Sequence, residues 1–367
     1  MLILARALSF PSMQSHVKRP RRPISSAAHS MVGLLVVALL APRDTHAQAQ
    51  TRWTSLNDYL ERGIGLTAAQ RSALARGEVV GRVLPMGDDR DIGVFAAVQV
   101  AVPRSLFRER QLAFAQAIRA PSRRVVQQFG NPASDADVRQ LELSDDEVKD
   151  LRACRANRCD FKLPAVEMDT MRAMASGAGR AQLNSYVRRR LLDFVADYRR
   201  RGNAAMPVYD DRGRVRATDA LAALLDDSSH VYKVVPALDR FLRNYPRETL
   251  PDASDVLFWS IDDLPHVRPV LRVMHTTVLS PPELSGATVV ASKQVYANHY
   301  FEAGLETLTA LDGAKPGAIT LIAVRLYRFD NLPGGVLNIR GRVRSGMLSN
   351  AESDLARLKR DYESSTR

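Results

Sequence analysis

Histidine, tyrosine and arginine side chains occur within strand-like runs in the last third of this 367-residue chain, where most of their neighbours are apolar. Polar groups enclosed among apolar side chains must either pair with one another or contact a ligand. The candidate ligand-binding residues are His275, Tyr296, His299, Tyr300, Arg325 and Tyr327. Hydrogen bonds satisfied within the protein explain the same pattern without a ligand, and the sequence leaves both interpretations open.

Signatures of catalysis are missing from the sequence. His299 and Glu302 are a conceivable acid–base pair, but residues three apart on one strand face opposite sides of a sheet. The chain has no G-x-S-x-G elbow, no H-E-x-x-H zinc helix and no G-x-x-x-x-G-K-[ST] phosphate loop. Its histidines lack the spacing of metal ligands, and its paired aspartates stand where turns and helix starts favour aspartate. We therefore assign no catalytic residue, no metal and no cofactor.

The chain has two cysteines, Cys154 and Cys159. In an oxidising compartment, an even pair so close together favours a local disulfide. A metal site needs more ligands than the intervening residues supply, and a redox dithiol is usually spaced C-x-x-C. We expect a structural disulfide.

The N-terminal 49 residues have the order of parts typical of a secretory signal peptide. Basic residues 18–22 (KRPRR) precede an apolar run at 31–42 (MVGLLVVALLAP), and the small-residue pattern Ala47-Gln48-Ala49 follows it. The apolar run is too short to span a bilayer, which needs about 20 residues, and a buried core helix is the alternative. We expect cleavage near Ala49 and a periplasmic or secreted protein, exported by the Sec or the twin-arginine route. The translation start is either Met1 or Met13.

Composition is consistent with a globular exported domain at residues 50–367. Residues 1–49 hold six of the 52 Lys and Arg and one of the 40 Asp and Glu, which leaves 46 against 39 in the remainder. This mild positive excess in an exported protein argues against nucleic acid as a partner. No long apolar run follows residue 49, so we expect no transmembrane segment in the mature chain.

The elements that must position the candidate residues begin with a helix over 56–77 and a hairpin of strands 79–84 and 92–102. Both faces of the second strand are nearly apolar, so both should be covered. Short strands are expected at 125–129 and 138–143. Four further strands, 271–279, 288–296, 299–311 and 318–329, have short connections that imply an antiparallel sheet.

Helices are expected in the middle and at the end of the chain. The segments 165–201 and 218–245 flank a small hairpin at 208–215, and together they form a helical insertion around 165–250. The last helix carries one apolar stripe, formed by Ile339, Val343, Met347, Ala351, Leu355, Leu358 and Tyr362. Gly341 and Gly346 in this helix indicate either its start or a close packing contact.

This order of elements resembles the helix-grip fold of START-like lipid-transfer and polyketide-cyclase-like proteins. The resemblance covers residues 78–102 and the segment from Leu257 to the C-terminus. The phrases CRANRCDFKLP (154–164), ASKQVYANHYF (291–301) and RGRVRSG (340–346) are also similar to those of exported bacterial proteins of uncharacterised activity. The resemblance implies an α+β domain whose antiparallel sheet grips a long C-terminal helix, interrupted by a helical insertion.

The leading functional hypothesis is an exported, non-catalytic binding protein for a hydrophobic small molecule or lipid, since a sheet and an apolar-striped helix can enclose an apolar cavity. One alternative is an enzyme on the same scaffold that uses His275, His299 or Arg325. Another is a cell-envelope protein-interaction module that uses the arginine-rich helix at 184–201. The sequence specifies no protein partner.

Overall fold

The computed structural model describes residue 53 and residues 55–120, 122–177, 179–228, 230–263, 268–313, 315–331 and 338–365. The expected signal peptide lies outside these residues. Residues Gln50–Arg367 form one compact unit.

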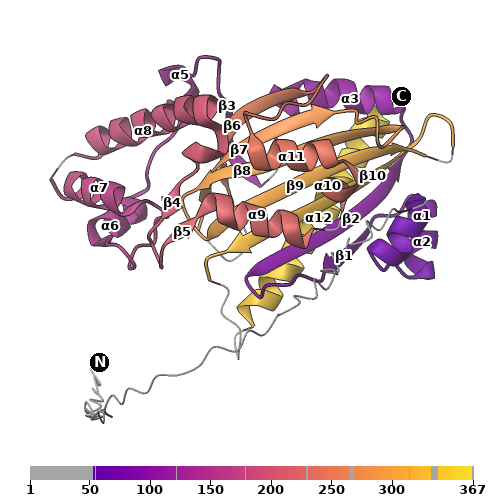
Figure 1. Ribbon diagram of the computed structural model, residues 1–367, viewed down its shortest axis with the longest axis horizontal. Coiled ribbons are helices and arrows are strands. Elements are labelled where there is room, and N and C mark those ends of the chain that lie inside the picture. Colours follow the sequence, from indigo (N-terminus) through magenta and orange to yellow (C-terminus); the bar gives the residue numbers. More distant parts are fainter. Residues whose placement is uncertain are drawn as a thin grey trace, which may run out of the picture. The chain divides into compact units, whose positions relative to one another are not determined.

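The centre of this unit is an eight-stranded antiparallel sheet with the strand order β1-β2-β10-β9-β8-β7-β6-β3 (Figure 1). Its strands are β1 Val80–Leu84, β2 Asp91–Val100, β3 Arg123–Gln128, β6 Ser254–Asp262, β7 Val270–Leu279, β8 Ala287–Ala297, β9 Phe301–Asp312 and β10 Ile319–Phe329. Strands β6 to β10 lie in sequence order, and the N-terminal hairpin joins them through the pairing of β2 with β10. The expected antiparallel sheet is confirmed.

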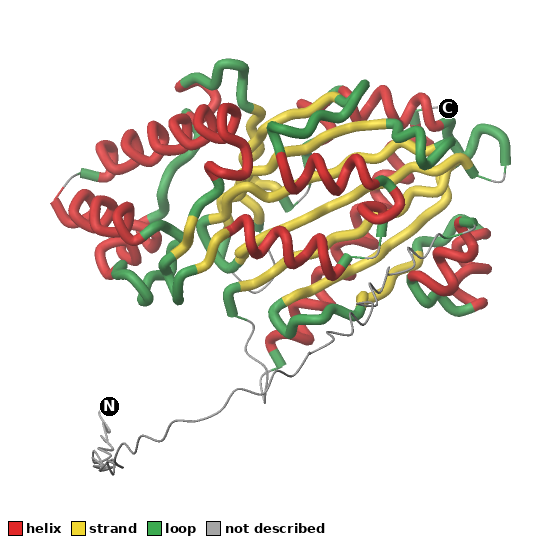
Figure 2. The backbone as a smooth tube through the Cα atoms, viewed as in Figure 1, coloured by secondary structure: helices red, strands yellow, loops and turns green. Residues whose placement is uncertain are grey.

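Helices cover both faces of the sheet, as Figure 2 shows. Alternation along β2 sends Phe95 and Ala97 into one apolar cluster and Val94 and Val98 into the other. The prediction that both faces of this strand are covered is therefore correct.

One face is covered by α3 (Arg104–Leu112), α4 (Phe114–Ala117) and the C-terminal helix α12 (Ile339–Ser364). Helix α12 contacts β1, β2 and β10, and α3 contacts β7, β8 and β9. The expected apolar stripe of α12 packs here, with Ala351, Leu355 and Tyr362 buried. The side chain of Asn338 caps the helix by accepting from the N–H of Gly341 (3.1 Å), so Gly341 stands in the first turn.

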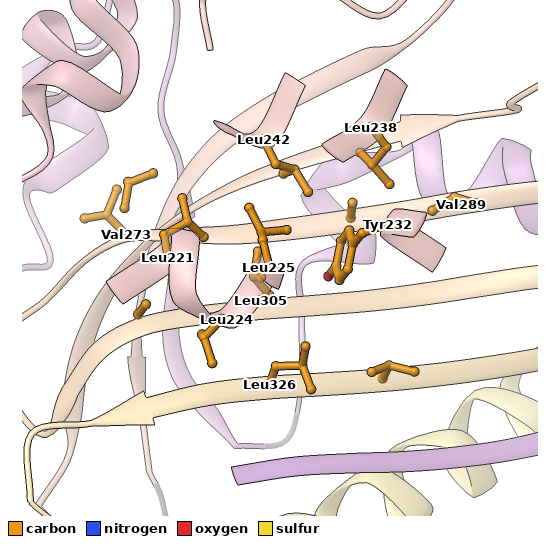
Figure 3. Packing of buried hydrophobic residues seen from close by; sticks show 14 of the residues in the cluster. Leu221, Leu224, Leu225, Tyr232, Leu238, Leu242, Val273, Val289, Leu305 and Leu326 are labelled. Carbon is orange, nitrogen blue, oxygen red and sulfur yellow. The ribbon is translucent and has the colours of Figure 1, made fainter. Parts of the chain in front are cut away.

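The opposite face is covered by α9 (Ala217–Asp227), α10 (Val231–Val234) and α11 (Pro236–Asn244). Figure 3 shows leucines of α9 and α11 packed against side chains of the sheet; labelled are Leu221, Leu224, Leu225, Leu238, Leu242, Val273, Val289, Leu305 and Leu326. The single helix expected at 218–245 is instead three helices. Pro236 is one cause, because proline has no N–H to continue a helix and starts α11 at its first turn.

The helical insertion contains α6 (Asp145–Ala153), α7 (Ala165–Gly177) and α8 (Arg180–Arg201), then the short 3₁₀ helix η2 (Gly202–Ala205) and the hairpin β4 (Val208–Tyr209) and β5 (Val215–Arg216). Cys154 and Cys159 form the expected disulfide and lie in an apolar cluster with α6 and α7. Helical elements are thus inserted as predicted, but α6 begins before the expected range of 165–250, and α9, α10 and α11 within that range cover the sheet.

Two local expectations were wrong. Residues 138–143 are not a strand: α5 (Asp135–Val138), which starts after a capping box of Ser134 and Asp137, ends at Val138, and a turn follows it. Strand β6 was not foreseen. Before the sheet, α1 (Leu56–Asp58), the π-helix η1 (Tyr59–Gly63) and α2 (Ala68–Ala75) replace the helix expected at 56–77, and the side chain of Thr67 caps α2.

The sheet with its C-terminal helix is compatible with a helix-grip fold. Within the described part of the chain, no helix combines the length and apolar character needed to cross a membrane.

Candidate functional site

A cavity of about 210 Å³ lies on the sheet face that α12 covers. Strands β6 to β10 form its floor, and α4, residues 118–123 and α12 form its walls. It therefore lies between the sheet and the C-terminal helix and is partly open to solvent.

Apolar side chains form most of the walls of this cavity. The helices contribute Phe114, Ile118, Val343, Met347, Leu355 and Leu358, and the sheet contributes Phe258, Val290, Phe301, Leu308, Ala323 and Phe329. Gly346 on α12 also lines the cavity, and a β-carbon there would have no other described atom within 4 Å. The close packing considered for this glycine is not found. Its missing side chain instead leaves space.

Arg272 on β7 is the centre of an ionic network in the cavity floor, and its side chain is 4 % exposed. It donates from Nη1 to Oδ2 of Asp262 (3.1 Å) and from Nη2 to Oε1 of Glu306 (2.9 Å). Its Nε donates to Oε1 of Gln294 (3.1 Å). The guanidinium therefore uses its donors on groups from three other strands, as a buried charge requires.

Glu306 on β9 is the common partner of several cationic side chains in the cavity floor. It also accepts a hydrogen bond from the hydroxyl of Tyr327, and Nη2 of Arg123 lies 3.8 Å from its Oε2. Burial acts to raise the pKa of Glu306, but the charges of Arg272, Arg123 and Arg325 lower it to about 2. Glu306 is thus ionised at neutral pH.

Gly304 on β9 permits the Tyr327 contact. In the register of β9 and β10, Tyr327 is opposite Gly304, and Arg325 is opposite Glu306. A β-carbon at Gly304 would lie 2.9 Å from Cδ1 of Tyr327. Because glycine has none, the tyrosine ring can lean across β9 toward Glu306.

Arg325 connects the floor of the cavity to its helical wall. Its Nη2 donates to Oδ2 of Asp354 on α12 (2.6 Å). A second polar pair in the floor is formed by the hydroxyls of Thr276 and Ser292, 2.6 Å apart, either of which can donate. Oδ1 of Asp262 is buried without a partner among the described residues.

Three of the six predicted site residues line this cavity: Tyr300, Arg325 and Tyr327. His275 and Tyr296 lie on the opposite face of the sheet, where they contact Tyr198 and Phe194 of α8, respectively. His299 lies in the turn between β8 and β9, against Phe161 of the helical insertion. The six residues therefore do not form one site.

His275 is part of a separate buried polar group. Its Nε2 lies 2.8 Å from Oδ2 of Asp255, and its Nδ1 lies 3.0 Å from the hydroxyl of Tyr198. Burial lowers the pKa of His275, whereas the hydrogen bond to Asp255 and the charge of Asp255 act to raise it. The effect of burial is the larger. The enzyme hypothesis used His275, His299 or Arg325, and of these three residues Arg325 alone lines the cavity.

Arg272, Asp262, Glu306 and Arg123 are cavity residues that the sequence analysis missed. A signal was present, since Arg272 and Glu306 are charged residues inside long apolar strands. The described residues contain no group of three or more His, Cys, Asp or Glu able to hold a metal ion.

Comparison with protein-family models, with curated proteins and with solved structures gave no match.

Proposed function

We propose that this chain is an exported binding protein of START-like, helix-grip architecture that holds a hydrophobic small molecule or lipid between its sheet and α12. The observation that carries the proposal is the cavity of about 210 Å³ with mainly apolar walls. An apolar cavity of about 150 Å³ accommodates benzene, whereas drug-sized ligands occupy about 300–1,000 Å³. The occupant is therefore small, and a lipid would be a short one.

The Cys154–Cys159 disulfide supports export, because such bonds persist in oxidising compartments. The signal-peptide pattern at residues 1–49 supports the same proposal.

The alternative of an envelope interaction module receives less support from α8. Arg188 donates to the carbonyl of Leu141 and to Glu142, and Arg190 pairs with Glu167. The guanidinium groups of these two arginines therefore bind other groups of the same chain.

Filling the cavity tests the binding proposal. We expect purified protein to bind 1-octanol saturably in calorimetric titrations and to release a small hydrophobic compound on organic extraction. Gly346→Phe should abolish both, because its side chain would occupy the space that Gly346 leaves open.

Two variants control this experiment. Gly346→Ala removes the helix penalty of glycine, about 1 kcal/mol, with little loss of volume, and should bind octanol. Ser349→Phe places the same ring on an exposed position of α12 and should also bind. Failure of the unmodified protein to bind octanol, or unchanged binding by Gly346→Phe, would refute the proposal.

A further inference from the structure

We propose that the molecule held in this cavity carries a carboxylate, and that Arg325 is its partner. This inference rests on the proposed binding function and specifies the class of ligand: a short amphipathic acid.

The charges that line the cavity are unbalanced. Six arginines line it: Arg119, Arg123, Arg272, Arg325, Arg342 and Arg357. Three carboxylates line it: Asp262, Glu306 and Asp354. Among the residues that the structure describes, the lining contains no lysine or histidine, so these side chains give the cavity an excess of three positive charges. A concave site lined by one sign of charge attracts ligands of the opposite sign.

Each carboxylate already has a cationic partner. Asp262 and Glu306 both accept from Arg272. Asp354 accepts from Arg325 and lies 3.9 Å from Nη2 of Arg357. The excess is therefore on the arginines, and a cationic ligand would find no unpaired carboxylate to bind.

Arg325 has donors to spare at the floor of the cavity. Its contact with Asp354 uses Nη2, and its Nε and Nη1 donate to no other residue that the structure describes. Its side chain is 23 % exposed, although its neighbours Val324 and Leu326 are buried. An arginine with unused N–H donors can donate charge-assisted hydrogen bonds to a carboxylate.

Arg342 on α12 strengthens the same preference. It lines the cavity, it is exposed, and its guanidinium pairs with no other described residue. The positive charge thus extends from the floor, at Arg325, to an exposed part of the lining.

The volume of the cavity limits the chain length of the acid that it can hold. If about 150 Å³ holds the six carbons of benzene, each carbon needs about 25 Å³, and a cavity of about 210 Å³ holds about eight. Octanoate is the matched probe, and 1-octanol and octylammonium share its chain with a neutral and a positive head.

The test is calorimetric titration of the three probes into the purified protein at pH 7.5 and moderate salt. We expect octanoate to bind about tenfold more tightly than octanol, and octylammonium to bind more weakly than octanol. Raising the salt concentration should weaken octanoate binding and leave octanol binding unchanged.

Arginine variants identify the partner. Arg325→Gln should remove the preference for octanoate over octanol, and Arg342→Gln should reduce it by a smaller factor. Arg342 is exposed and unpaired among the described residues, so this variant is expected to fold even if Arg325→Gln does not. Arg189→Gln removes an exposed arginine of α8 that is outside the lining and should leave the preference unchanged.

The outcomes separate the two proposals. If none of the three probes binds, the binding function itself fails. If octanol binds and octanoate binds no more tightly, or if octylammonium is preferred, the cavity is a binding site but the ligand is not an acid. A preference for octanoate that survives both Arg325→Gln and Arg342→Gln would overturn the assignment of the partner.

Discussion

Two glycines determine the shape of the cavity at the scale of single residues. Gly304 lets the ring of Tyr327 cross β9 to reach Glu306, and Gly346 leaves open space beside α12. Glycine inside a strand or a helix costs stability, because it has more conformational freedom to lose. At both positions the missing side chain makes room for something else: for a neighbouring ring at Gly304 and for the cavity at Gly346.

Lys293 on β8 is buried on the face of the sheet away from the cavity. Its Nζ donates to Oδ1 of Asn203 (2.7 Å) and to the carbonyl of Leu242 (3.2 Å), and it lies over the rings of Tyr198 and Tyr245. Burial lowers its pKa from 10.5 to about 7.

This lysine should make stability depend on pH. Above pH 10.5 the lysine is neutral in both the folded and the unfolded state. In that range it does not change how the free energy of unfolding varies with pH. Between about 7 and 10.5 the unfolded state binds a proton that the folded state does not, so stability rises with pH, by at most about 1.4 kcal/mol per unit.

The comparison with Lys293→Met isolates this effect. We expect the free energy of unfolding of the unmodified protein, relative to that of the variant, to increase from pH 7 to pH 10 in urea denaturation. Lys149→Met, at an exposed position, is the control. A constant difference between the unmodified protein and Lys293→Met over this range would contradict the prediction.

At the scale of elements, the helical insertion is held by its own small core and by the disulfide. The bond closes a loop with a sequence separation of five residues. In the chain-entropy model such a short loop contributes about 2 kcal/mol.

Removing the disulfide should weaken the insertion without affecting the cavity. We expect Cys154→Ala with Cys159→Ala to lower the free energy of unfolding by about 2 kcal/mol and to leave octanol affinity unchanged, because neither cysteine lines the cavity. A large loss of octanol affinity in the folded double variant would show that the insertion controls the site.

The elements predicted best from the sequence are those whose apolar residues follow a regular pattern. The apolar stripe of α12 identified its buried side, and the two apolar faces of β2 showed that helices cover both sides of the sheet. Strand β6 was missed because its central residues are buried on both faces, so no alternation distinguishes it.

The site was only partly predictable, because it depends on which face of the sheet holds the cavity. Strand parity places His275 on the same face of β7 as Val273, but both faces of β7 are buried, so parity alone cannot show which of them borders the cavity. The Arg272 network joins several strands, and its partners follow from the register between those strands and not from their spacing in the sequence.

At the scale of the whole molecule, the two faces of the sheet are packed differently. The face under α9, α10 and α11 is a packed core, which includes Tyr198, Tyr232 and Trp259. The face under α12 contains the cavity and its ionic floor. We therefore propose that the face under α12 binds the ligand and that the opposite face supports the fold.

The most direct test of this assignment is the position of bound 1-octanol. We would label the methyl groups of Met, Leu and Val and measure nuclear Overhauser effects between them and the octanol chain. We expect contacts with Met347, Leu355 and Val290, which line the cavity. Contacts with Leu221 or Val273 on the opposite face, or no saturable contact at all, would contradict it.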